Sequence, residues 1–195
     1  MIRKEKKSKT GLILVIFIAG IMVTSVFGVI FFGFGNSQET TRVEYNGFTL
    51  SKGAEYWATP INNQEINFRF LPSQLEDINL TQDIINKISN IVEIDTTSAL
   101  NDTYKEEIAL ANFELAQELR KLNIYIREGF TTNETARPKI TCLDATNAIP
   151  VVFFIKSNTT QLTLENNCII AEANAALDAL RIKDRLLYSI TGIIK

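Results

Sequence analysis

The chain has 195 residues, of which 46% are hydrophobic and 22% are charged, and its formal net charge is -2. This balance is typical of a globular protein and lacks the basic excess that neutralises nucleic-acid phosphates, so nucleic acid is not an expected partner. Histidine is absent, which excludes Ser-His-Asp and Cys-His catalytic sites and histidine-containing zinc sites. The remaining chemistry rests on carboxylate, Lys, Tyr, Ser or Thr side chains, and the sequence implies no cofactor.

An uncharged apolar segment follows a basic start. Residues 1–9 read MIRKEKKSK, and residues 10–35 carry no charge. A helix needs about 20 apolar residues to cross a bilayer, so residues 10–35 are predicted to form a transmembrane helix. The positive charges place residues 1–9 in the cytoplasm and everything after the linker 36–42 outside the cell. The alternative is a cleaved signal peptide, although its apolar core usually has about 7–15 residues and ends in small residues.

The rest of the chain, residues 43–195, is predicted to form one extracytoplasmic domain of the α+β class with a mixed sheet. It opens with an antiparallel β-meander. Asn46-Gly47 is a hairpin-turn signal, and apolar and polar residues alternate over 66–70. Thr81 is then expected to cap a short helix.

The middle of the domain predicts a β-α-β unit. Strands over 90–95 and 123–128 flank a helix that begins after Asn101 or Asp102. The helix has an apolar stripe at three- and four-residue spacing, which comprises Tyr104, Ile108, Ala111, Leu115, Leu119 and Leu122. Parallel pairing with a right-handed crossover is expected for such a unit.

A polar loop over 131–139 separates this unit from the last elements. Strands over 150–157 and 160–173 are predicted to form a hairpin with its turn at Asn158. A helix from about residue 174 to 190 then closes the domain, and Lys183 lies on its apolar arc. A lysine there can extend its stem to solvent, or its amine can be desolvated.

This order of elements resembles the core of the thioredoxin-like fold, in which a cis-proline begins the third core strand where Ile149-Pro150 stands. A thioredoxin-like core is therefore the alternative fold, and extracytoplasmic thiol or folding chemistry is the function that it implies. The C-x-x-C motif of that family is missing, because the matching region reads DTTSALNDTY.

Several longer stretches are similar to a group of uncharacterised single-pass membrane proteins of small-genome archaea. The stretches that carry this resemblance are YNGF, FRFLPSQLEDI, TCLDATNAIPVVFFIKSN, NCII and DRLLYSITGI. No function is known for the group, so the resemblance implies a membrane location and a compact outer domain.

The two cysteines of the chain, Cys142 and Cys168, both lie in the outer domain. An even number of cysteines in an oxidising compartment predicts a disulfide bond. Two buried free thiols and a reactive thiol are the alternatives.

Three carboxylates are candidate metal ligands. Asp95 and Asp102 flank the carboxyl end of a predicted parallel strand, where open α/β sheets bind ligands, and Asp144 could join them around Ca²⁺ or Mg²⁺. Helix capping by Asp102 and solvation of the loops explain the same residues without a metal. Glu93 and Asp95 alternate along one strand, as a paired-carboxylate hydrolase could use them, or they lie on the surface.

The expected function is that of a non-catalytic interaction or structural module at the cell surface. Its expected partners are membrane lipid, through the N-terminal helix, and another membrane or cell-surface protein. A degenerate thioredoxin-like protein and a carboxylate-based metal binder or hydrolase are the alternatives. Asn133 and Asn158 fit the glycosylation sequon and fall in predicted loops.

Overall fold

The computed structural model describes residues 13–24 and 41–194. The chain divides into two units, Met1–Thr40 and Thr41–Lys195. Residues 13–24 are helical, and no helix within the two described ranges is long and apolar enough to cross a membrane. The predicted transmembrane helix over 10–35 extends beyond the described residues at both ends. The tail 1–9 and most of the linker 36–42 also lie outside them, so these assignments stay predictions.

The second unit opens with the predicted antiparallel meander. Its four strands pair in sequence order: β1 (Arg42–Tyr45), β2 (Phe48–Lys52), β3 (Trp57–Ile61) and β4 (Gln64–Phe68). The β1–β2 and β3–β4 turns each place two residues at positive φ, namely Asn46 and Gly47 in the first and Asn62 and Asn63 in the second. Asparagine and glycine tolerate this conformation best, which explains the tight turns. The first strand begins one residue earlier than the predicted domain boundary.

A five-stranded mixed sheet forms the second half of the unit. Its strands lie in the order β6 (Tyr125–Phe130), β5 (Glu93–Ser98), β7 (Val151–Lys156), β9 (Cys168–Ala173) and β8 (Gln161–Glu165). Four of these strands are parallel, and β8 pairs antiparallel with β9. The helix α3 (Lys105–Lys121) connects β5 to β6, so the predicted parallel β-α-β unit is confirmed.

The hairpin predicted to start at Pro150 does not form. The strand that follows Pro150, β7, pairs in parallel with both β5 and β9. The hairpin consists of β8 and β9, which turn at Asn166 with a φ of 57°. The predicted single strand over 160–173 is therefore two strands. Among the described residues every peptide bond is trans, including Ile149–Pro150.

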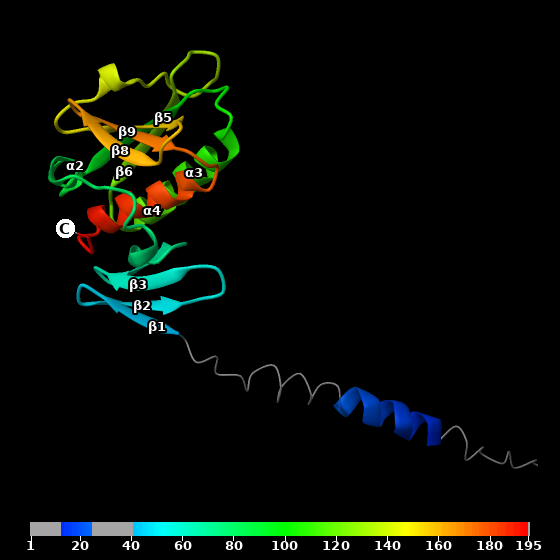
Figure 1. The fold of residues 1–195 in the computed structure, drawn as a ribbon. Coiled ribbons are helices and arrows are strands. Elements are labelled where there is room, and N and C mark those ends of the chain that lie inside the picture. The colour runs from blue at the N-terminus through cyan, green and yellow to red at the C-terminus, as the bar shows by residue number, and fades with distance from the viewer. Residues whose placement is uncertain (1–12, 25–40, 195) are drawn as a thin grey trace, which may run out of the picture. The chain divides into compact units, whose positions relative to one another are not determined.

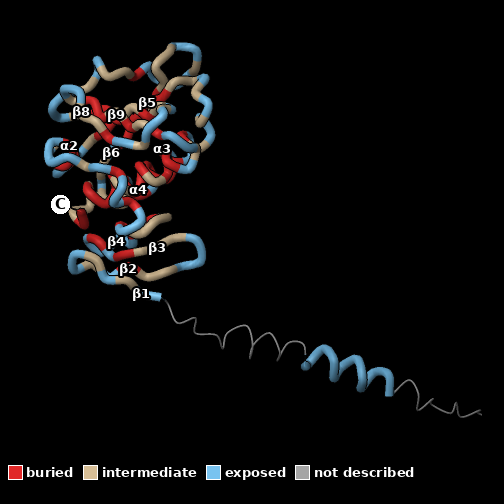
Figure 2. The backbone as a smooth tube through the Cα atoms, viewed as in Figure 1, coloured by how far each residue is buried: buried red, intermediate tan, exposed pale blue. Residues whose placement is uncertain are grey.

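Two helices lie between the meander and the mixed sheet (Figure 1). They are α3 and α4 (Asp178–Ile190), and the short α2 (Gln82–Ile88) packs beside α4. Buried residues concentrate along these helices and the strands that face them (Figure 2). The rings of Phe68 in β4 and Tyr188 in α4 stack with their centroids 3.9 Å apart. The helices thus share one core with both sheets.

Charged side chains inside this core join the meander to both helices. The Lys183 side chain of α4 is 1% exposed; its ammonium group donates to Asp184 and lies 3.2 Å from Oε2 of Glu114 in α3. Arg69, which follows β4, also pairs with Glu114. The prediction that the Lys183 stem reaches solvent is therefore wrong. The helices place two carboxylates beside the amine, and these compensate its charge in the interior.

The two anions of this network differ in their surroundings. Asp184 is fully buried, and its Oδ2 accepts the backbone N–H groups of Arg69 at 2.7 Å and Phe70 at 2.9 Å. Burial raises the pKa of Asp184 although Lys183 opposes this effect. Burial alone would also raise the pKa of Glu114, but hydrogen bonds and charge from Arg69 and Lys183 hold it below its usual value. Two cations thus balance two anions.

Candidate functional site

A cleft of about 500 Å³ lies between α3 and β6. We call it the α3–β6 cleft. It is lined by residues at the carboxyl ends of the parallel strands β5 and β6 and along the face of α3 beside them. Open α/β sheets bind their ligands beyond the carboxyl ends of their strands, which makes this cleft the first candidate for a binding site.

One wall of the α3–β6 cleft is a face of α3. Its lining residues recur at three- and four-residue spacing and comprise Lys105, Glu106, Ala109, Asn112, Phe113 and Arg120. Residues with this spacing share one side of a helix. The neighbouring stripe of α3, with Ile108, Ala111 and Leu115, is buried in the core, so the cleft lies along the margin of that core.

The opposite wall combines strand ends with the loop that follows β6. Ser98 and Leu100 come from the end of β5, and Glu128 and Phe130 come from β6. Arg137 reaches the cleft from the loop and forms an ion pair with Glu128. Because alternate residues of a strand share a face, Glu128 and Phe130 both point to the helix side of the sheet.

The loop approaches β6 so closely that residue 129 must be glycine. A Cβ atom at Gly129 would lie 2.4 Å from the backbone oxygen of Pro138 and 2.7 Å from the side chain of Ile140. The N–H of Phe130 donates to Pro138 at 3.1 Å, and the N–H of Ile140 donates to Phe130 at 2.9 Å. The missing side chain thus allows residues 138–140 to lie against the end of β6.

Asn112 is a polar residue with an unused amide in this cleft. It lies beside the buried stripe of α3 and is 6% exposed. Its Oδ1 is buried and has no hydrogen-bond partner among the described residues. A buried polar group without a partner destabilises a fold by about 1–3 kcal/mol. Asn112 is also one of the residues that line the α3–β6 cleft, so this unpaired amide belongs to the cleft wall.

Replacing Asn112 by leucine should raise the free energy of unfolding by about 1 kcal/mol, because leucine has a similar size and removes the unsatisfied amide. The same change should weaken binding in the cleft. Urea unfolding, followed by the fluorescence of the single tryptophan, measures the first effect. Gln117→Leu, at an exposed position of the same helix, is the control and should change stability by less than about 0.5 kcal/mol. A loss of stability in Asn112→Leu would show that the amide has a partner.

The cleft carries more positive than negative charge once the two residues of its ion pair are set aside. Glu128 and Arg137 neutralise each other. Lys105 and Arg120 form no ion pair within the described part of the chain, and neither does Glu106. Two unpaired cations thus face one unpaired anion. This balance favours ligands that carry negative charge.

The predicted metal ligands Asp95 and Asp102 each have partners of their own. Asp95 is fully buried on the sheet face opposite α3, where Arg127 donates to both of its carboxylate oxygens. Asp102 accepts the N–H of Tyr104 at 2.8 Å and the N–H of Lys156 at 3.0 Å. It therefore ties the turn before α3 to the end of β7. The predicted capping of α3 by Asn101 or Asp102 is wrong, because α3 begins later, at Lys105, and its N-cap residue is Tyr104, which makes no side-chain capping hydrogen bond.

Asp144 lies in the short 3-10 helix η2 (Cys142–Asp144). Its carboxylate accepts the N–H of Thr141 at 2.7 Å and the hydroxyl of Thr141 at 2.9 Å. These two bonds lower the pKa of Asp144. The structure brings no three acidic or cysteine side chains together at a metal-binding spacing in the ranges that it describes.

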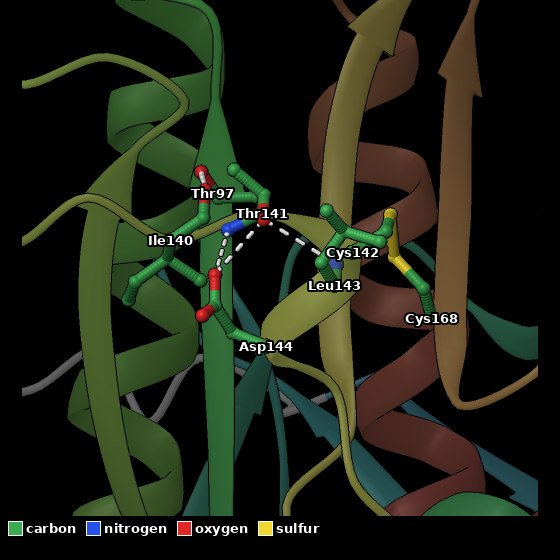
Figure 3. The surroundings of a disulfide bond; sticks show 7 residues. All are labelled: Thr97, Ile140, Thr141, Cys142, Leu143, Asp144 and Cys168. Carbon is green, nitrogen blue, oxygen red and sulfur yellow. Dashed lines mark hydrogen bonds between the residues drawn. A yellow bond between two sulfur atoms is a disulfide. The ribbon is translucent and has the colours of Figure 1, made fainter.

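Cys142 and Cys168 form the predicted disulfide (Figure 3). Their Cα atoms are 5.2 Å apart, and the bond closes a separation of 26 residues. It fastens η2 to the start of β9 on the sheet face opposite α3. Thr97 donates its hydroxyl to the carbonyl of Ile140 at 2.7 Å beside it. The disulfide is therefore a structural link.

The two candidate glycosylation residues, Asn133 and Asn158, are both exposed and lie in loops. Their modification stays a prediction.

Comparisons of the chain with known protein families, with curated proteins and with solved structures find no match. Function is therefore inferred from the cleft itself. Sequence reasoning did not predict the cleft, although one signal was available. Asn112 interrupts the apolar side of a helix whose outer side carries two exposed apolar residues, Leu110 at 39% and Phe113 at 55%.

Proposed function

We propose that residues 43–195 form a non-catalytic binding module at the outer surface of a cell membrane and that the α3–β6 cleft is its binding site. The observation that carries this proposal is the unsatisfied amide of Asn112 in a cleft with apolar walls. Binding sites are concave, mostly apolar and contain a few placed polar groups, and this cleft has all three properties.

The anchor in this proposal is the apolar segment over 10–35. In its described part, every large apolar side chain from Ile13 to Val23 is between 49% and 67% exposed. A helix that is apolar on all sides requires an apolar environment, and a bilayer supplies one. The basic residues before it support a cytoplasmic N-terminus.

The redox and carboxylate alternatives find less support in the geometry. Both cysteines are joined in the disulfide, and Cys168 is fully buried. The carboxylates of Asp95, Asp102 and Asp144 are occupied by hydrogen bonds from their neighbours. A binding role instead uses a polar group that has no partner among the described residues, namely the amide of Asn112.

Photo-crosslinking in native membranes tests the proposal. A benzophenone amino acid is placed at Phe113, in the cleft, and in a second variant at Leu177, which is 54% exposed and outside the cleft. We expect a discrete crosslinked product in the membrane fraction from position 113 and none from position 177. Equal products from both positions, or none from position 113, would contradict a partner in the cleft.

The orientation needs a separate measurement in the same cells. A membrane-impermeant amine reagent should modify the exposed Lys156 of the outer domain in intact cells. It should reach the lysines of residues 1–9 only after the membrane is opened. Labelling of residues 1–9 in intact cells would overturn the proposed orientation.

A further inference from the structure

The strand β6 lies at the edge of the mixed sheet. On its inner side, the N–H groups of Tyr125 and Thr131 donate to the carbonyls of Val92 and Ser98 at 2.9 and 3.1 Å. The backbone groups of successive strand residues point to opposite sides. The N–H and C=O groups of the even-numbered residues over 126–130 therefore point away from β5, to the outer edge.

Among the residues that the structure describes, only part of this outer edge is used. Residues 138–140 take both backbone groups of Phe130, as described above. In the described residues, no backbone or side-chain hydrogen bond reaches the outer-edge groups of Ile126 or Glu128. An open strand edge is a template for a further strand.

The open edge borders a long groove. The α3 wall extends from Lys105 to Arg120, and a rise of 1.5 Å per residue makes it about 22 Å long. An extended peptide advances about 3.3 Å per residue, so six or seven residues would cover about this length. The cleft therefore fits an extended chain that runs beside β6 and α3.

The lining groups of the cleft complement a peptide. The side-chain amide of Asn112 offers a donor and an acceptor, which match the C=O and N–H groups of a peptide backbone. Phe113 and Phe130 provide apolar surface for side chains. Lys105 and Arg120, which outnumber the unpaired Glu106, favour acidic residues in the ligand.

We infer that the ligand of the α3–β6 cleft is an extended acidic peptide segment of another protein, which adds to the outer edge of β6 as a further strand. This inference rests on the proposed function. Backbone hydrogen bonds to Ile126 and Glu128 supply the affinity. Every second side chain of the added strand faces the cleft, and at these positions the cleft selects apolar residues together with Asp or Glu.

Selection from a displayed library of random peptides, each about nine residues long so that it exceeds the groove, tests this inference on the full chain in detergent. We expect enrichment of peptides in which every second residue is apolar or is Asp or Glu. Two variants then separate the contribution of the backbone N–H of Glu128 to binding from that of its side chain. Glu128→Pro removes the outward N–H, and Glu128→Ala removes the same carboxylate but keeps the N–H.

An edge strand tolerates proline where its N–H faces outward, so both variants should fold. Glu128→Pro should bind the selected peptides about tenfold or more weakly than Glu128→Ala binds them. Both variants lack the carboxylate and release Arg137 from its ion pair, and Glu128→Pro alone lacks the N–H. If Glu128→Pro fails to fold, selected peptides that are N-methylated on alternate residues replace it. Two such peptides are made, one methylated on the odd-numbered residues and the other on the even-numbered residues. One of the two should bind the unaltered chain about tenfold more weakly, because its methyl groups replace the N–H groups that face β6.

The outcomes distinguish strand addition from binding in the cleft as such. Peptides that bind Glu128→Pro as well as Glu128→Ala, yet lose affinity for Asn112→Leu, would overturn strand addition and leave the cleft as the binding site. Peptides that are unaffected by all three changes would overturn both proposals. A library without enrichment would overturn the peptide ligand, and the crosslinking from position 113 would then decide the proposed function independently.

Discussion

Replacing Lys183 by methionine should lower the free energy of unfolding by about 3–5 kcal/mol at neutral pH. Methionine fills a similar volume but removes the cation that faces Asp184 and Glu114. Arg69 then remains as the single cation beside two buried carboxylates. An uncompensated buried charge is destabilising because the interior solvates it poorly. Urea unfolding of the full chain in detergent measures the loss.

The pH dependence of this loss follows from Asp184. Burial already raises the pKa of Asp184, and removal of Lys183 would raise it further. A carboxyl group with a higher pKa in the folded state than in the unfolded state binds more protons when folded, so acidification favours folding. The deficit of Lys183→Met should therefore be largest near neutral pH. It should shrink as the pH falls through the raised pKa toward about 4, the value in the unfolded chain.

The same substitution at an exposed lysine is the matched control. Lys105 is exposed and forms no ion pair with any described residue, so Lys105→Met should change stability by less than about 0.5 kcal/mol. A loss below about 1 kcal/mol in Lys183→Met, or a loss that does not depend on pH, would mean that the two carboxylates do not need this cation.

Removing the disulfide should lower the free energy of unfolding by about 3–4 kcal/mol. The bond closes a separation of 26 residues, and this constraint reduces the entropy of the unfolded chain. The double variant Cys142→Ala with Cys168→Ala avoids a buried hydroxyl at position 168. Its unfolding midpoint in urea, compared with that of the oxidised protein, measures the effect.

Chemical reduction of the unaltered protein provides the control for this prediction. It should reproduce the loss seen in the double variant, because both remove the same covalent link. Hydrogen exchange should also quicken at the amide of Ile140, which bonds to Phe130 beside the cleft. If the reduced protein kept its stability while the double variant lost it, packing of the sulfur atoms and not the link would be responsible.

Local signals in the sequence account for the meander and the β-α-β unit. Asn46-Gly47 forms its turn because both residues tolerate positive φ. The stripe that includes Ile108, Ala111 and Leu115 is buried because helical spacing alone determines which side faces the core. The disulfide likewise follows from the number of cysteines and the expected compartment.

The rest of the mixed sheet depends on contacts between distant residues. β9 inserts between β7 and β8, and no local pattern fixes that arrangement. The positive φ of Asn166 marks the turn that divides the predicted strand over 160–173, and the Asn166-Asn167 pair was its only local signal. Lys183 is buried because α3 brings Glu114 to it from far along the chain. The cleft, too, exists only once α3 is placed against β6.

The place where the chain enters the second unit has a mechanical consequence. The carbonyl of Thr41 accepts the N–H of Lys52 at 2.8 Å, and four residue pairs then join β1 to β2. Tension that arrives through residue 41 acts at the open end of this hairpin, so its pairs would separate one after another, as in a zipper. β4 resists further opening because carboxylates of the two helices hold its backbone. The N–H of Asn67 in β4 donates to Glu118 of α3, and the N–H of Arg69, which follows β4, donates to Asp184 of α4.

The meander can therefore lengthen under load while the mixed sheet keeps its shape. A protein that is pulled between a fixed N-terminal segment and a bound ligand would extend first at β1, the strand that is farthest in its sheet from β4. The α3–β6 cleft would keep its shape during that extension, since its walls belong to α3, the mixed sheet and the loop after β6, none of which is part of the meander.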